Sequence, residues 1–322
     1  MRRTAAGLVD TALEVPVVPS FTRVGHSVRS RLDAWRPVES YDLSRRVVVL
    51  TGATSGLGLA AARTMAQIGA TLVLVGRDRQ RTEAVRRALP PPAEGSHEVV
   101  VADMGELAAV RAAGELIRAG HPRVDALLHN AGALSAERRL SPDGIEETVA
   151  AQVVGPFLLT SLLLEPLRAA AAGRVVTMSS GGMYASGLTV DHLQMSEREY
   201  GGAEQYARAK RAQVTLNEMW AERVDPAEVV FHAVHPGWAD TPGVSTSLPT
   251  FRRITGPLLR SPEQGANTMV WLVADDEATR SSGRFWLDRR PRSLHRLPTT
   301  RRTDTPERRR ALWQWVSESA QV

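Results

Sequence analysis

Cysteine is absent from this 322-residue chain, lysine occurs once, and aromatic residues make up only 5%. The lack of cysteine excludes disulfides, thiolate metal sites and cysteine nucleophiles. The eight histidines show no HExxH spacing, so we expect no metal. No uninterrupted apolar run approaches the length of a membrane span, and no signal peptide is evident. The sequence therefore predicts a cytoplasmic protein.

The single lysine, Lys210, stands four residues after Tyr206, in a chain whose 40 Lys and Arg residues are otherwise all arginine. An ammonium is a compact charge with a tunable pKa, unlike a guanidinium. Positions i and i+4 share one helix face, and a nearby cation lowers the pKa of a phenol from about 10. The pair predicts Tyr206 as a general acid/base. The alternative is a surface lysine that happens to follow a tyrosine.

Short apolar runs alternate with helical patterns between residues 46 and 288. The runs are 47–50, 71–75, 99–101, 125–128, 174–178, 229–234 and 284–287. Apolar strands alternating with helices predict a parallel sheet buried on both faces, wound by right-handed crossovers. We therefore expect an α/β fold: a Rossmann-type doubly wound parallel sheet of about seven strands, in a single domain.

Two segments flank this domain, an extension over residues 1–45 and a basic tail over 289–322. In the extension, apolar residues recur at helical steps between arginines: Phe21, Val24, Val28, Leu32 and Trp35. This pattern predicts a basic amphipathic helix that packs on the main domain or a partner subunit, with a peripheral membrane contact as the alternative. A second helix is predicted from Thr305-Pro306, with Ala311, Leu312, Trp315 and Val316 as its buried stripe.

Basic charge is concentrated near the C-terminus. Between Arg284 and Arg310, ten arginines stand against three acidic residues, a local balance of +7 within a net charge of +5. Such a run is most often a solvated surface, although it is also typical of contacts with nucleic acid or anionic lipid. No aromatic residues interleave it as a base-stacking platform would require, so no nucleic acid partner is expected.

A glycine-rich segment lies at the first strand–helix junction. Its candidate cofactor ligands are Thr51, Gly52, Thr54, Ser55, Gly56, Leu57 and Gly58. Glycines there let the backbone approach a pyrophosphate, and the helix N-terminus offers free N–H donors. No Gly-Lys-Ser/Thr follows, so this is not a P-loop. A purely structural turn is the alternative.

The residues after the second and third strands predict which dinucleotide binds. Arg77 comes first after the second strand and can pair with a 2′-phosphate, which favours NADP, with NAD as the alternative. Asp78 is predicted as a helix N-cap. Asp103, after the third strand, is a candidate acceptor for the adenine amino group or another N-cap, and Met104 beside it is placed at the same cofactor edge.

Five motifs in order resemble the short-chain dehydrogenase/reductase family over about residues 46–288. They are the Gly52/Gly56/Gly58 spacing, Asn130-Ala131-Gly132, Ser179-Ser180, Tyr206-x-x-x-Lys210 and Pro236-Gly237. A closer likeness, carried by Ser179 to Met183 and His235 to Val244, is to the branch called dehydrogenase/reductase family member twelve.

The resemblance implies roles for these residues. Tyr206 would exchange a proton with the substrate oxygen, while Lys210 holds the nicotinamide ribose and lowers the pKa of Tyr206. Ser180 would hydrogen-bond the substrate oxygen, with Ser179 as the fallback. The remaining cofactor ligands would be Asn130, Ala131, Gly132, Pro236, Gly237 and Thr241. The cofactor supplies the hydride, and the protein supplies orientation and proton transfer.

The chain departs from the family at Gln152, three residues before Gly155, where relatives carry an asparagine that organises a water chain to the lysine. Gln152 is therefore a candidate member of the catalytic set with an altered proton relay. His129 also replaces a frequent asparagine, a variation expected to be benign. Because family members often pair through their fourth and fifth helices, the resemblance further implies a homo-oligomer.

The long connections after the fifth and sixth strands predict the substrate pocket. Met183, Tyr184, Leu188 and Leu193 would line one wall. Residues 242–259 would form a lid carrying Leu248, Phe251 and Ile254. The resemblance, together with Arg77, implies an NADP-dependent oxidoreductase, and these apolar residues favour a small apolar aldehyde, ketone or alcohol as its substrate. The alternative is a non-catalytic NAD(P)-binding sensor or scaffold protein.

Overall fold

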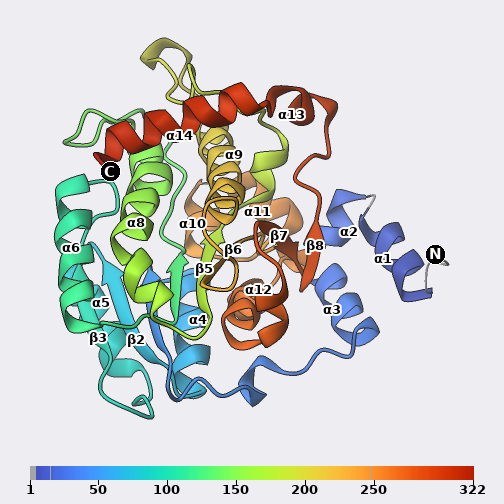
Figure 1. The fold of residues 1–322 in the computed structure, drawn as a ribbon. Helices are drawn as coiled ribbons and strands as arrows, with labels where there is room; N and C mark the ends of the chain where they lie inside the picture. The colour runs from blue at the N-terminus through green and yellow to red at the C-terminus, as the bar shows by residue number, and fades with distance from the viewer. Residues whose placement is uncertain (1–4, 15, 248) are drawn as a thin grey trace.

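An eight-stranded sheet forms the centre of the protein, in the order β3-β2-β1-β4-β5-β6-β7-β8 (Figure 1). The computed structural model describes residues 5–14, 16–247 and 249–322. The strands are β1 (Val47–Thr51), β2 (Thr71–Gly76), β3 (Glu98–Val101), β4 (Ala126–His129), β5 (Gly173–Met178), β6 (Val229–Val234), β7 (Arg284–Leu287) and β8 (Arg290–Arg292). Strands β1 to β7 are parallel, which confirms the predicted doubly wound sheet.

The eighth strand was not expected. β8 pairs antiparallel with β7 through a two-residue turn, Asp288-Arg289, in which both residues have positive φ of 56° and 53°. Tight hairpins of this kind usually carry Asn-Gly or Asp-Gly, so the sequence lacks the local signal. The domain end expected at residue 288 therefore falls inside this hairpin.

Helices cover both faces of the sheet. One face carries α4 (Gly56–Gln67), α5 (Arg79–Ala88) and α12 (Pro262–Ala274), and the other carries α6 (Leu107–Gly120), α8 (Gly155–Arg168) and α9 (Gly202–Ala221). Alternate residues of β1 serve the two faces, with Val49 in one apolar cluster and Val48 in the other. Burial on both sides explains why the strands read as continuous apolar runs.

One long apolar helix crosses this core. It consists of α7 (Glu147–Val149), the π segment η2 (Ala150–Val154) and α8. Its length and composition would suffice to cross a membrane, but 72% of its apolar window is buried inside the domain. We therefore assign it as a core helix.

The shorter elements connect the sheet and form the flanks. The helices are α1 (Ala5–Glu14), α2 (Val17–Phe21), α3 (Arg23–Leu32), α10 (Pro242–Ser247), α11 (Pro249–Thr255), α13 (Pro298–Thr303) and α14 (Pro306–Ala320). The 3₁₀ turns are η1 (Val38–Ser40), η3 (Gly181–Tyr184), η4 (Glu197–Glu199), η5 (Gly256–Leu258) and η6 (Asp276–Arg280). The N-terminal extension packs against the β8 edge of the sheet (Figure 1).

The two ends of the chain are joined by ion pairs. Arg292 of the tail contacts Asp10 of the extension at 2.8 Å, and Arg290 contacts Asp33 at 2.5 Å. Arg296 pairs with Glu14. Part of the basic run that was expected to be solvated is therefore an internal contact, because the acids that pair with it lie far away in sequence.

The C-terminal helix α14 lies across α8 and α9 (Figure 1). Leu312 and Val316 are fully buried there, whereas Ala311, expected in the buried stripe, is exposed. Trp313 packs edge-on against Trp220 with ring centroids 4.9 Å apart, and Arg309 bonds Glu218 at 2.5 Å. The helices expected to pair two subunits are thus covered by the chain's own C-terminus.

Candidate active site

The glycine-rich segment meets the Asn130-Ala131-Gly132 segment at the carboxyl ends of β1 and β4. Gly52 has a positive φ of 73°, and a Cβ on it would lie 2.8 Å from the Ala131 Cα. A Cβ on Gly58 would lie 2.1 Å from the Gly52 carbonyl oxygen. Only glycine permits either approach. The backbone of the glycine-rich segment can therefore lie directly against that of the Asn130-Ala131-Gly132 segment.

The N-terminus of α4 fits a dinucleotide pyrophosphate. Ser55 is its N-cap residue, and its side chain makes no capping bond within the described part of the chain. The N–H groups of Gly56, Leu57 and Gly58 have no intrahelical acceptor, because they belong to the first turn. These donors and the positive end of the helix dipole suit a bound anion. Thr54 stands two residues before Gly56, the first of these donors.

Thr51 and Asn130 shape the cleft by bonding to each other's segments. The Thr51 hydroxyl oxygen accepts from the N–H groups of Asn130 and Ala131, each at 3.0 Å. The Asn130 side-chain amide donates to the Gly52 carbonyl oxygen at 2.9 Å. Both residues were predicted as cofactor ligands, but their side chains are used within the protein. They hold the two loops in register.

At the adenosine end, the Arg77 side chain is 76% exposed and its Nη1 lies 3.8 Å from Asp103 Oδ2. Asp78 caps α5 by accepting from the Arg81 N–H at 3.0 Å, which confirms its predicted role. The capping alternative for Asp103 is wrong, because α6 has Glu106 as its N-cap.

The side chain of Met104 packs in the apolar core and is only 5% exposed. The Met104 side chain therefore contacts the protein core instead of the predicted cofactor site. The Asp103 carboxylate accepts from the Gly105 N–H at 2.9 Å and so orders the same loop.

Ser180 and Tyr206 come together beyond the end of β5. Ser180 opens the turn η3, where its Oγ accepts from the Gly182 N–H at 3.3 Å, and its side chain lies close enough to the Tyr206 phenol to affect the pKa of that group. Ser179 is 2% exposed, and its hydroxyl has no partner among the residues that the structure describes. Because Ser180 is partly exposed and faces Tyr206, the structure favours Ser180 over the fallback.

Lys210 lies below Tyr206 on the same face of α9. Its Nζ donates to the Met178 carbonyl oxygen at 2.9 Å and is 5.3 Å from the centroid of the Tyr206 ring. Burial lowers the pKa of Lys210 to about 7. Burial also raises the pKa of Tyr206 to about 12, against the opposing effect of Ser180. This direction is opposite to the lowering expected from the sequence, because desolvation disfavours the charged phenolate.

Gln152 occupies the π segment η2 and is 1% exposed. Its amide nitrogen donates to the Ala133 carbonyl oxygen at 2.7 Å, while its amide oxygen has no partner in the described chain. A Cβ on Gly132 would lie 2.9 Å from that oxygen. Gln152 thus closes the floor beneath the Asn130-Ala131-Gly132 segment. π segments inside α-helices are frequent at functional sites.

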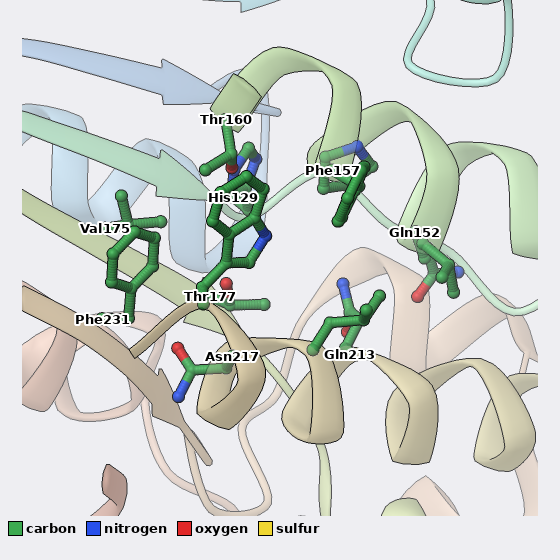
Figure 2. Close-up of a pocket in the computed structure, with 13 residues that line it drawn as sticks. His129, Gln152, Phe157, Thr160, Val175, Thr177, Gln213, Asn217 and Phe231 are labelled. Carbon is green, nitrogen blue, oxygen red and sulfur yellow. The ribbon is translucent and has the colours of Figure 1, made fainter. Parts of the chain in front are cut away.

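A small cavity, lined by apolar side chains and a few polar ones, extends from Gln152 between α8 and α9 (Figure 2). The space open to the centre of a water molecule is about 30 Å³. Gln213, Asn217 and His129 also line it, each with one buried polar atom that lacks a partner in the described residues. About 10–15 Å³ accommodates one water, and such atoms are the usual partners of buried water.

The sequence interpretation missed this cavity. Gln213 and Asn217 follow Lys210 at i+3 and i+7, so a helical wheel would have placed all three on one face. His129 bonds Thr160 at 2.8 Å, and burial lowers its pKa to about 3, which keeps the imidazole neutral.

The segment after β6 carries the predicted cofactor residues Pro236, Gly237 and Thr241. Gly237 has a φ of 75°, and a Cβ on it would lie 2.3 Å from the guanidinium carbon of Arg260. Arg260 also donates to the Pro236 carbonyl oxygen at 3.2 Å. Thr241 reaches back to the glycine-rich segment, since a Cβ on Gly56 would lie 3.2 Å from the Thr241 Cβ. Arg260, which no motif singled out, therefore supports two predicted cofactor residues.

The expected pocket wall is wrong. Met183, Tyr184, Leu188 and Leu193 are each at most 8% exposed and belong to apolar core clusters. Trp238 and Phe251, whose ring centroids are 5.0 Å apart, are partly exposed on the lid side instead. Ile254 is 74% exposed, and Leu248 lies outside the described residues.

Comparison with known proteins agrees with this geometry. The sequence model of the short chain dehydrogenase family matches residues 46–250. The human protein dehydrogenase/reductase SDR family member 12 is 36% identical over 279 residues, which cover 86% of this chain and 87% of the relative. Human retinol dehydrogenase 14 is 31% identical over 268 residues, covering 76% and 78%.

A solved structure from Mycobacterium paratuberculosis superposes with a TM-score of 0.71 at 26% identity, covering 89% of this chain and 98% of its own. The family match spans the glycine-rich segment, Ser180, Tyr206 and Lys210, the residues that the fold assembles at one edge of the sheet. The chain therefore belongs to the short-chain dehydrogenase/reductase family.

Proposed function

We propose that the protein is an NADP-dependent oxidoreductase that transfers a hydride between nicotinamide and an apolar aldehyde, ketone or alcohol. The observation that carries this proposal is that Tyr206 lies close to Ser180, with Lys210 beneath it on the same face of α9, in a fold whose first helix, α4, offers free N–H donors to an anion. The nicotinamide supplies or accepts the hydride, so the protein needs only to bind, orient and move a proton.

Ser180 and Tyr206 would hold the substrate oxygen between their hydroxyl groups. A pKa of about 12 keeps Tyr206 a neutral phenol at neutral pH, able to donate its proton to that oxygen. Lys210, with a pKa of about 7, changes charge within the same pH range and could return the proton to Tyr206.

NADP is favoured over NAD because of Arg77. No acidic residue occupies the first position after β2, where a carboxylate would accept from the ribose 2′-hydroxyl. Among the described residues, the exposed Arg77 guanidinium has a 3.8 Å contact with Asp103 as its only ion pair, so it is available for a 2′-phosphate.

An apolar substrate is supported by Trp238 and Phe251, the partly exposed aromatic pair on the lid side of the cleft. Retinol dehydrogenase 14, a relative at 31% identity, is named for an apolar alcohol.

The test is consumption of NADPH and NADH against a panel of apolar aldehydes and ketones, with a Tyr206→Phe variant alongside. We expect turnover with NADPH and a loss of about 10²–10⁴-fold in the variant, because one proton-transfer group is removed. Cofactor binding should be nearly unchanged, since phenylalanine keeps the aromatic ring at this position and removes only its hydroxyl group. Undiminished turnover in the variant would refute the mechanism. NADPH binding without turnover on any substrate would support the non-catalytic sensor instead.

A further inference from the structure

We infer that the N-terminal extension is a positioning element of the active site, which acts through Phe21 and through a buried cluster of Arg29, Asp288 and Arg260. This inference rests on the proposed function. The extension would hold both the turn that carries Ser180 and the segment after β6 in place.

Phe21 ends α2 directly against the segment that follows β6. Its ring meets His235 edge-on with centroids 4.3 Å apart, and Trp238 edge-on at 5.8 Å. The Phe21 carbonyl oxygen accepts from the Trp238 N–H at 2.7 Å. Phe21 is 3% exposed, so its ring is enclosed by the main domain. Trp238 in turn packs on Phe251 of the lid.

The same ring supports the turn that carries Ser180. A Cβ on Gly181 would lie 3.1 Å from Phe21 Cε2 and 3.0 Å from His235 Nε2. The backbone next to Ser180 therefore rests on Phe21 and His235 together. Burial lowers the pKa of His235 to about 3, so this support stays uncharged and does not titrate near neutral pH.

A buried ionic cluster attaches the extension at a second point. Arg29 donates to Asp288 at 2.7 Å, and Arg260 donates to the same carboxylate at 2.6 Å and 2.9 Å. All three side chains are at most 1% exposed. Charge-assisted bonds in such surroundings are short and directional, which fixes the three groups relative to one another.

Arg260 connects this cluster to both the extension and the cofactor side. It donates to the carbonyl oxygens of Ser20 at 3.0 Å and Thr22 at 3.2 Å, and to that of Pro236 at 3.2 Å. One guanidinium thus joins the end of α2 to the Pro236-Gly237 turn. The glycine-rich segment is held separately, by Thr51 and Asn130.

Because different residues hold the segment after β6 and the glycine-rich segment, Phe21 should affect carbonyl turnover and NADPH binding to different extents. Loosening Phe21 should disturb the positions of Ser180 and Trp238, which act on the substrate, and leave the anion-binding donors of α4 in place. Displacement of a positioning group by about 1 Å can cost up to about 10²-fold in rate. Because the segment after β6 also carries the predicted cofactor residues Pro236 and Gly237, NADPH binding should weaken slightly, but far less than carbonyl turnover.

The experiment compares Phe21→Ala with Leu312→Ala in the full chain. Leu312 is the matched control because it is also a buried apolar residue of a terminal helix, but it packs on α8 and α9. We expect Phe21→Ala to lower kcat/KM for the carbonyl about tenfold or more, with the Kd for NADPH within about twofold. Leu312→Ala should lower the melting temperature and keep kcat/KM, per folded molecule, within about twofold.

A second readout is independent of activity. Amide hydrogen exchange over residues 179–184 and 235–238 should become faster in Phe21→Ala and stay unchanged in Leu312→Ala. Phe21→Leu, which keeps an apolar side chain, should fall between the wild type and Phe21→Ala, and it serves if the alanine variant does not fold.

Unchanged kcat/KM together with unchanged exchange in the Phe21 variants would overturn the inference, as would losses that merely follow the folded fraction. A wild-type protein with no carbonyl turnover would refute the proposed function alone. In that case faster exchange over the two segments would still support the positioning role, and unchanged exchange would reject it.

Discussion

The Lys210 ammonium donates to the Met178 carbonyl oxygen at 2.9 Å, so the one lysine of the chain is anchored to the end of β5. Tyr206 sits above it and lies close to Ser180. This arrangement places a buried amine with a lowered pKa directly under a phenol with a raised one.

The first prediction concerns stability and pH. Because burial lowers the Lys210 pKa to about 7, the unfolded chain binds more protons than the folded one between pH 7 and the unfolded pKa of about 10.4. The free energy of unfolding should rise with pH in this window by up to about 1.4 kcal/mol per unit. Tyr206 does not interfere, because its raised pKa affects stability only above about pH 10.

Denaturant unfolding at pH 7 and pH 9.5 measures this effect. Lys210→Met should lose the rise that the wild type shows. Equal slopes in the two proteins would mean that Lys210 keeps an ordinary pKa in the folded state.

The second prediction separates two adjacent serines. Ser180→Ala should lower kcat by about 10²-fold or more, because it removes a donor to the developing charge on the substrate oxygen. Ser179→Ala is the matched control. Its hydroxyl is buried without a partner in the described chain, so we expect activity within about twofold and no loss of stability. If Ser179→Ala loses more activity than Ser180→Ala in steady-state assays, Ser179 is the catalytic serine.

The third prediction concerns cofactor choice. Arg77→Ala should raise the KM for NADPH about tenfold or more while changing the KM for NADH little, since only NADPH carries the 2′-phosphate. Arg81→Ala is the control, because Arg81 is 79% exposed on the neighbouring turn and pairs with Asp78. If Arg81→Ala raises the KM for NADPH as much as Arg77→Ala does, the positive charge of the whole region, and not Arg77 itself, sets the preference for NADPH.

The fourth prediction concerns α14. We expect the full chain not to pair through α8 and α9, because Leu312, Trp313 and Val316 already pack there. Leu312→Ala should lower the free energy of unfolding by about 2–5 kcal/mol. Removal of residues 305–322 should expose the covered surface and cause association, which light scattering after size-exclusion chromatography would detect. A full chain that dimerises, with α8 or α9 protected in the dimer, would contradict this expectation.

Local patterns predicted much of the architecture. The apolar runs and their breaks located the seven parallel strands, and Asp78 was correctly predicted as a cap because capping depends on a few neighbouring residues. The i, i+4 spacing of Tyr206 and Lys210 also needs only helix geometry. The hairpin at Asp288-Arg289 escaped prediction, because its left-handed residues are held by distant partners rather than by glycine.

By itself the sequence determined the fold class and the order of the motifs, because periodicity, turns and capping act over a few residues. Only the tertiary structure decided which carbonyl oxygen binds Lys210, which serine faces Tyr206, and how burial shifts their pKa values. It also decided that Arg29 pairs with Asp288, 259 residues away, and that Met183 and Tyr184 join the core. Desolvation and charge pairing depend on which groups share one interior, and that is settled only when the whole chain has packed.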